Sequence, residues 1–165
     1  MIHRLAPFLF LLLLGLSASL NAQIVNPITW RTYHEPAKDL KVGDEVTVYF
    51  EGTIKMGYHI YSAVPAEELP QLASFLDIAD ANRGVEALGE LQEKGEAETK
   101  YDAIFELNIT IYKNEVIFSQ KFKITEENPK LSVYIGYQVC NENMCVPSSI
   151  DYSAQLTTTT APRVE

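Results

Sequence analysis

The residues whose chemistry stands out are Cys140 and Cys145, because the chain contains no other cysteine. Cys140 ends one alternating apolar segment and Cys145 precedes another, so residues 141–144 are expected to form the loop of a hairpin. Neighbouring antiparallel strands can bring two cysteine Cα atoms within the roughly 4.4–6.8 Å that a disulfide requires. The spacing therefore predicts a disulfide at a hairpin tip, provided that the protein folds in an oxidising compartment.

A disulfide at this position is a weak stabiliser of a fold. In the chain-entropy model, a loop closed this tightly gains only about 2 kcal/mol. Sandwiches that use a disulfide for stability usually tie their two sheets together across a long sequence separation. A disulfide at a hairpin tip is instead open to a partner thiol, and exposed disulfides are the exchangeable ones. The pattern favours thiol–disulfide exchange, with a structural bridge as the alternative.

Metal binding is the other chemistry that these residues allow. Two thiolates with His34, His59 or Met144 would suit a soft metal. The four residues between the cysteines exceed the spacing of common zinc knuckles, however, and the chain has no second Cys/His pair. Both histidines lie among aromatic residues, where packing is the ordinary role. We expect no metal and no cofactor, and the sequence supplies no obvious base or cation beside the cysteines.

The segments that must position the cysteines are typical of β-strands. Val46–Phe50 is a β-branched and aromatic run. Apolar residues then recur on alternate positions, as in half-buried strands, in four further segments: Phe105, Leu107, Ile109 and Ile111; Val116, Phe118, Phe122 and Ile124; Leu131, Val133, Ile135, Tyr137 and Val139; Ile150, Tyr152, Ala154 and Leu156. Short polar turns separate these segments. The chain is therefore predicted to be an all-β, antiparallel β-sandwich.

One segment, Pro65–Glu98, does not follow the strand pattern. It is rich in Ala, Glu, Leu and Gly, and residues 67–72 are expected to hold a short turn of helix. Gly84, Gly89 and Gly95 argue against a long helix over the rest. We predict a long inserted loop that covers one face or end of the sandwich.

The N-terminal segment, residues 1–22, has the pattern of a secretory signal peptide. His3 and Arg4 precede an apolar run, Leu5–Leu16, and small or polar residues follow as far as Ala22. The apolar run is shorter than the roughly 20 residues that span a bilayer. We predict cleavage after Ala22, which leaves residues 23–165 as one exported domain without a membrane span.

The net charge of the chain is −9 at pH 7, counting histidine as neutral. Proteins that bind nucleic acid or anionic lipid through electrostatics carry basic patches. The acidic balance therefore argues against both kinds of partner, and solubility is sufficient to account for it.

The sequence around the cysteines resembles the N-terminal domain of the thiol:disulfide interchange protein DsbD, also called the disulfide bond corrector family. The resemblance rests on the Tyr-Gln-Val-Cys run at 137–140 and the Cys-Val-Pro run at 145–147. Segments 28–30, 57–62 and 118–124 are similar to its opening strand, its Gly-aromatic-His-aliphatic-Tyr segment and the strand before the cysteine hairpin. The likeness covers nearly the whole of the predicted mature chain.

This resemblance implies an immunoglobulin-like fold in the periplasm. It implies electrons taken from a membrane transporter of the DsbD type and passed to periplasmic thioredoxin-fold proteins. Cys145 corresponds to the cysteine that engages the partner, and Cys140 to the one that resolves the mixed disulfide. Neither a transmembrane bundle nor a thioredoxin-like domain follows Glu165 in this sequence. If the chain is complete, we expect either that the transporter is a separate protein or that the circuit has been lost.

The family also shields its disulfide with a mobile cap loop that carries an aromatic residue and acidic neighbours. The matching place is around residues 100–105, where Tyr101 would cover the sulfurs and Asp102 would tune their proton affinity. Phe105 lies beside them, and we expect its ring to be part of the core.

A second class of function remains open on the sequence alone. The chain would then be a non-catalytic, exported β-sandwich that binds a protein or a small ligand, and its hairpin disulfide would be structural. The two hypotheses differ in whether the cysteine pair exchanges with partner thiols.

Overall fold

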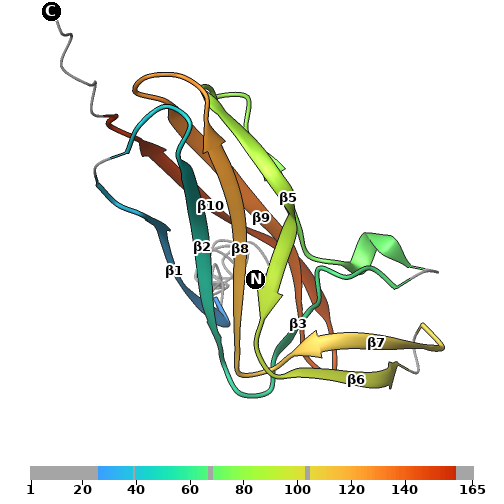
Figure 1. Cartoon of the computed structure of the whole chain (residues 1–165). Helices are drawn as coiled ribbons and strands as arrows, with labels where there is room; N and C mark the ends of the chain where they lie inside the picture. The colour runs from blue at the N-terminus through green and yellow to red at the C-terminus, as the bar shows by residue number, and fades with distance from the viewer. Residues whose placement is uncertain (1–25, 39, 67–68, 103–104, 159–165) are drawn as a thin grey trace, which may run out of the picture.

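The structure is a computed structural model that describes residues 26–38, 40–66, 69–102 and 105–158. The predicted signal peptide, residues 1–22, lies outside these ranges. The described residues form strands and one short 3-10 helix, η1 (Figure 1). The elements are β1 (Ile28–Glu35), β2 (Glu45–Ile54), β3 (His59–Tyr61), η1 (Pro70–Leu72), β4 (Phe75–Ile78), β5 (Val85–Lys94), β6 (Ala97–Asp102), β7 (Leu107–Tyr112), β8 (Glu115–Ile124), β9 (Lys130–Cys140) and β10 (Cys145–Gln155).

The strands form two sheets that face each other. One sheet has the order β1-β2-β8-β5, and the other has the order β10-β9-β3-β7-β6, with β4 paired to β9. Every pairing between these strands is antiparallel. The prediction of an all-β, immunoglobulin-like sandwich is confirmed.

The main core fills the space between the sheets. Successive side chains of a strand point to opposite faces, so the alternating apolar residues of β2, β8 and β9 all enter this space. Phe50, Phe118 and Phe122 are fully buried there. Burying a side chain of this size stabilises the fold by about 1.5–3 kcal/mol. The alternation that the sequence shows therefore defines the two inner faces.

A second, smaller cluster lies on the other face of the β3–β7 part of the sheet. Ile60 enters the main core, whereas the next residue, Tyr61, packs into this second cluster. Its buried members are Tyr61, Leu72, Ile109, Ile111 and Cys140. One of the two cysteines thus rests on an apolar bed that is separate from the main core.

The prediction of a long loop over residues 65–98 is wrong. The segment contains β4, β5 and the first two residues of β6, and β5 pairs with β8 as an edge strand. Its register shifts between Leu88 and Gln92, beside Gly89 with φ +70°. An edge strand with a bulge exposes much of its surface, so its sequence is polar and lacks strict alternation. The helical turn expected at residues 67–72 is present as η1, and residues 67 and 68 lie outside the described ranges.

No helix in the described part of the chain is long and apolar enough to cross a membrane.

Candidate functional site

The cysteines occupy the tip of the β9–β10 hairpin, as predicted. Cys140 is the last residue of β9, Cys145 is the first of β10, and the two are directly paired in register. They form a disulfide with their Cα atoms 4.0 Å apart. The side chain of Asn141 closes the loop between them, since its Oδ1 accepts hydrogen bonds from the backbone N–H groups of Asn143 and Met144 at 2.8 and 3.0 Å.

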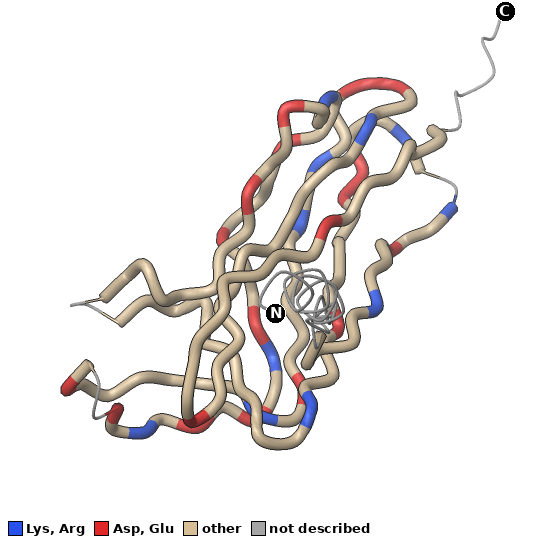
Figure 2. The backbone as a smooth tube through the Cα atoms, turned by 180° about the vertical axis from the view of Figure 1, so that it is seen from behind, with Lys and Arg blue, Asp and Glu red and all other residues tan. Residues whose placement is uncertain are grey.

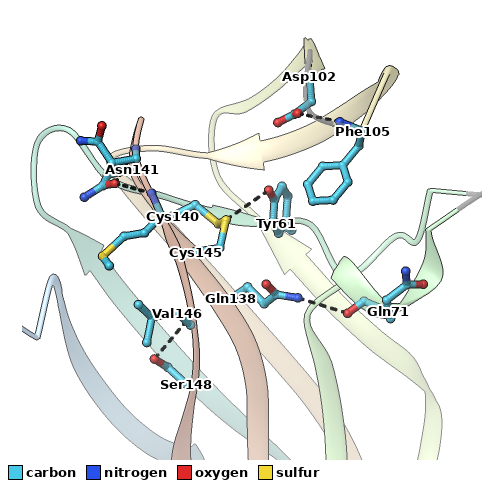
Figure 3. The surroundings of a disulfide bond; sticks show 12 residues. Tyr61, Gln71, Asp102, Phe105, Gln138, Cys140, Asn141, Cys145, Val146 and Ser148 are labelled. Carbon is cyan, nitrogen blue, oxygen red and sulfur yellow. Dashed lines mark hydrogen bonds between the residues drawn. A yellow bond between two sulfur atoms is a disulfide. The ribbon is translucent and has the colours of Figure 1, made fainter.

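The two cysteines differ in their access to solvent. Cys140 is buried, with only 1% of its surface exposed, and packs in the small cluster with Tyr61 and Ile111. Cys145 is exposed, and its Sγ lies 3.7 Å from the hydroxyl of Tyr61 (Figure 3). A partner thiol that approaches the hairpin therefore reaches Cys145 first.

The short strand β3 places two polar aromatic residues beside the disulfide. His59 pairs directly with Cys140, and Ile60 pairs with Val139. Since alternate residues share a face, His59 and Tyr61 lie on the side of Cys140 while Ile60 enters the core. The imidazole and phenol rings meet edge to face, with centroids 5.7 Å apart.

Glu93 of β5 holds the end of β3 in place. Its carboxylate accepts hydrogen bonds from the Ser62 hydroxyl and from the backbone N–H of Ala63, both at 2.6 Å. Charge-assisted hydrogen bonds of this kind are stronger than neutral ones. The position of Tyr61 beside the disulfide thus depends in part on a carboxylate from the other sheet.

The imidazole of His59 is electrically neutral at neutral pH. Its Nε2 atom is buried and has no hydrogen-bond partner within the described residues. Burial lowers the pKa of His59 to about 4, and the charges of Lys100 and Lys113 act in the same direction. Asp102 and Glu98 oppose this shift more weakly.

A groove of about 800 Å³ opens over the disulfide. Its walls are the hairpin loop, the 56–61 segment, the end of β6 and Phe105. Acidic and basic residues are interspersed at the lower end of the molecule in Figure 2. One pair, Lys113 and Glu98, forms a salt bridge of 2.5 Å.

The predicted cap residues, Tyr101 and Asp102, end β6 and line this groove. Tyr101 is 62% exposed. An oxygen of Asp102 accepts the backbone N–H of Phe105 at 3.2 Å (Figure 3), and its charge, after burial, helps to raise the pKa of Tyr61. Phe105 is half-buried against the small cluster, so its ring is part of that cluster and also of the groove wall. Residues 103 and 104 lie outside the described ranges.

The structure brings residues to the disulfide that the sequence did not indicate. No base or cation was expected there, yet His59, Lys100 and Lys113 all line the groove. The alternation of His59 and Tyr61 indicates that the two side chains share one face of a strand. It does not show that this strand pairs with the strand that ends in Cys140. His34 lies elsewhere, on β1, where its ring hydrogen-bonds to Tyr152 of β10.

Of the possible metal ligands, His59 and Met144 line the same groove as the two cysteines, whereas His34 lies on β1. Among the residues that the structure describes, no three His, Cys, Asp or Glu side chains are placed to hold a metal ion.

The fold and the site together define an immunoglobulin-like domain with an accessible hairpin disulfide. The family described as "Thiol:disulfide interchange protein DsbD, N-terminal" matches residues 33–157, which is more than half of the chain. The chain belongs to this family, and it is a thiol:disulfide interchange domain by that membership.

Several solved structures are similar to this chain, and one of them, with a TM-score above 0.5, has the same fold. The N-terminal periplasmic domain of ScsB from Proteus mirabilis is 15% identical with a TM-score of 0.56, and the match covers 79% of this chain and 47% of that one. The chain therefore spans about half the length of that relative. The reduced DsbD N-terminal domain from Neisseria meningitidis is 21% identical with a TM-score of 0.39, covering 71% of this chain and 81% of that one.

A complex of the DsbD and PilB N-terminal domains from Neisseria meningitidis is also similar. It is 19% identical with a TM-score of 0.41, and the match covers 76% of this chain and 80% of that one. No curated protein matches the chain.

Proposed function

We propose that this domain is a periplasmic electron carrier whose Cys140/Cys145 pair takes electrons from a membrane transporter of the DsbD type and passes them to periplasmic thioredoxin-fold proteins. The observation that carries the proposal is the asymmetry of the disulfide, in which one cysteine is buried, the other is exposed, and both line a groove. Thiol–disulfide exchange requires attack along an accessible path to one sulfur. Family membership supports the same class of reaction.

In the reducing direction, Cys145 is the residue that engages the partner. Its thiolate attacks one sulfur of the partner disulfide, so a Cys145–partner bond forms and the other partner sulfur leaves with an electron pair. Cys140 then attacks the Cys145 sulfur, the internal disulfide forms, and the reduced partner departs. The transporter's dithiol recharges the domain by the reverse steps. The partner gains two electrons, which the cysteine pair loses.

Tyr101 and Asp102 act as a cap and a tuning group in this proposal. Both stand on the wall of the groove that leads to the disulfide. A ring at that position limits the access of bulky thiols, and a carboxylate there disfavours thiolate formation in its neighbourhood.

Export is part of the proposed function. Cleavage after Ala22 would release residues 23–165 to the periplasm, and the family match lies within that range. The pattern of residues 1–22 supports this step.

The competing function, a binding module with a structural disulfide, is less well supported. The disulfide closes a sequence separation of only 5 residues in a hairpin whose strands are already paired along their whole length. Its removal is expected to cost about 2 kcal/mol in the chain-entropy model. The reduced domain should therefore remain folded.

The deciding experiment measures the reduction potential by glutathione titration and then traps mixed disulfides in a periplasmic extract. Cys140→Ser leaves the exposed Cys145 free and should capture thioredoxin-fold partners, whereas the matched variant Cys145→Ser leaves a buried thiol and should capture none. A potential well below about −300 mV, together with no trapped partner, would overturn the carrier. Unfolding on reduction would overturn it as well.

A further inference from the structure

The buried cysteine has a histidine beside it. His59 of β3 and Cys140 of β9 are directly paired in antiparallel register. Residues paired in this way carry their side chains on the same face, with Cβ atoms about 4.5–5.5 Å apart. Both residues line the groove over the disulfide. The side chains of His59 and Cys140 therefore project from adjacent strands toward the same groove.

The hydrogen bonding of the His59 ring indicates which of its nitrogens carries the proton. Nε2 is buried without a hydrogen-bond partner in the described part of the structure. A buried N–H group without an acceptor is rarer than a buried lone pair without a donor. We therefore assign the proton of the neutral ring to Nδ1 and a lone pair to Nε2. A disulfide sulfur carries no hydrogen, so Cys140 can satisfy this lone pair only after reduction.

The charges around His59 keep it available as an acceptor. Lys100, Asp102 and Glu98 face it from β6, Lys113 faces it from the β7–β8 turn, and Tyr61 packs against it from β3. Burial and the two lysines hold the pKa of His59 at about 4. The ring is thus unprotonated throughout the neutral range.

The resolving step requires such a group. The thiolate is the nucleophile in disulfide exchange, and burial in an apolar cluster disfavours the charged form of a thiol. Cys140 is 1% exposed and has mainly apolar neighbours. Its proton must leave as the sulfur attacks, and water does not reach it directly.

We propose that His59 accepts the proton of the buried Cys140 thiol and relays it to solvent in the step that closes the disulfide, an inference that rests on the proposed exchange function. In the mixed disulfide, the Cys140 S–H group donates to Nε2. The Cys140 sulfur then attacks Cys145, the internal S–S bond forms, and the bond from Cys145 to the partner sulfur breaks. The partner sulfur leaves with the electron pair. The thiol proton passes to Nε2 while Nδ1 releases its own proton to water, so the ring stays neutral.

The two chemical steps can be timed separately with dithiobis(nitrobenzoate) as the probe disulfide. In the reduced full chain, attack by Cys145 releases the first nitrothiobenzoate ion, and ring closure by Cys140 releases the second. His59→Phe should leave the first release within about twofold and slow the second about a hundredfold, the lower end of what a positioned general base contributes. The control, His34→Phe, removes the other half-buried histidine and should change neither release.

Further readouts separate proton relay from a structural role. The second release in His59→Phe should rise about tenfold per pH unit, as expected when hydroxide replaces the base, and added imidazole should rescue His59→Ala. If His59→Phe does not fold, His59→Gln keeps a polar side chain and removes the relay. A second release that is unchanged in these variants would overturn the proposal. A wild-type chain without any first release would instead overturn the exchange function itself.

Discussion

The hydroxyl of Tyr61 lies 3.7 Å from the Sγ of Cys145, although the two residues come from different parts of the chain. The contact joins the exposed sulfur to a ring that is itself 2% exposed and packed in the small cluster. A fixed hydroxyl beside a reactive sulfur can donate a hydrogen bond to the thiolate form and so stabilise it. Burial, with a contribution from Asp102, raises the pKa of the Tyr61 phenol, so it remains protonated as a donor at neutral pH.

Replacement of Tyr61 by phenylalanine should make Cys145 less reactive. The variant keeps the ring and loses the donor, so we expect iodoacetamide to alkylate Cys145 about threefold to tenfold more slowly at pH 7, consistent with the loss of one hydrogen bond of about 1 kcal/mol. The measurement uses the reduced Cys140→Ser background. Tyr58→Phe, in the same groove, is the matched control. Equal rates in the two variants would mean that the hydroxyl does not act on the sulfur.

Truncation of the exposed ring at the groove should open the path to the disulfide. For Tyr101→Ala we expect glutathione to reduce the disulfide about threefold faster, while the free energy of unfolding changes by less than about 0.5 kcal/mol, as for other surface substitutions. Tyr101→Phe keeps the ring and should behave as the wild type. A reduction rate that is the same in all three proteins would refute the cap.

The stability of the domain should fall between pH 7 and pH 5. An unfolded histidine titrates near 6.5, whereas the pKa of folded His59 is about 4, so the unfolded chain binds more protons in this window. The contribution is complete above pH 6.5 and is lost as the pH falls toward 4. We expect a loss of about 1 kcal/mol by pH 5, less than the full shift implies because the ring is only half-buried.

Urea unfolding of the wild type and of His59→Phe at both pH values measures this effect. The variant should show a flatter dependence on pH. His34→Phe should also flatten the pH dependence of stability, since burial lowers the pKa of His34 in the same direction. Its effect should be smaller than that of His59→Phe. If the free energy of unfolding depends on pH in His59→Phe as it does in the wild type, His59 is not the group responsible.

Loss of the Glu93 carboxylate should affect both stability and exchange. Glu93→Ala removes the acceptor for Ser62 and Ala63. We expect the free energy of unfolding to fall by about 3 kcal/mol or more, because hydrogen bonds to charged groups contribute about 1.5–3 kcal/mol each and two are lost. Displacement of β3 should also slow exchange at Cys145. Glu90→Ala, at an exposed position of the same strand, should change neither quantity. An unchanged exchange rate in a destabilised Glu93→Ala would show that β3 stays in place without this anchor.

The parts of the fold that the sequence predicted are those with one buried face. Leu131, Val133 and Ile135 alternate strictly because β9 lies in the interior of its sheet, with one face against the main core. β5 was missed because an edge strand keeps only Val85, Ala87 and Leu91 against the core and exposes most of the rest. Apolar alternation in a sequence reflects a buried face, and an edge strand buries little of its surface.

The site was predictable only where it is local. Cys140 and Cys145 are close in sequence, so the hairpin and its loop could be inferred from the strand pattern on either side. The position of His59 opposite Cys140 depends on the pairing of β3 with β9, which are distant in the chain. Such a pairing is set by the packing of the whole sandwich, and no short motif records it.

The four buried residues that pack with Cys140 in the small cluster, Tyr61, Leu72, Ile109 and Ile111, have a consequence for how the domain responds to redox change. Because Cys140 belongs to this small cluster and not to the main core, opening and closing the S–S bond rearranges atoms at one end of the molecule only. The packing between the inner faces of the two sheets should stay the same when the disulfide opens and closes. Substitutions around the cysteines should therefore change thiol–disulfide exchange without destabilising the main core.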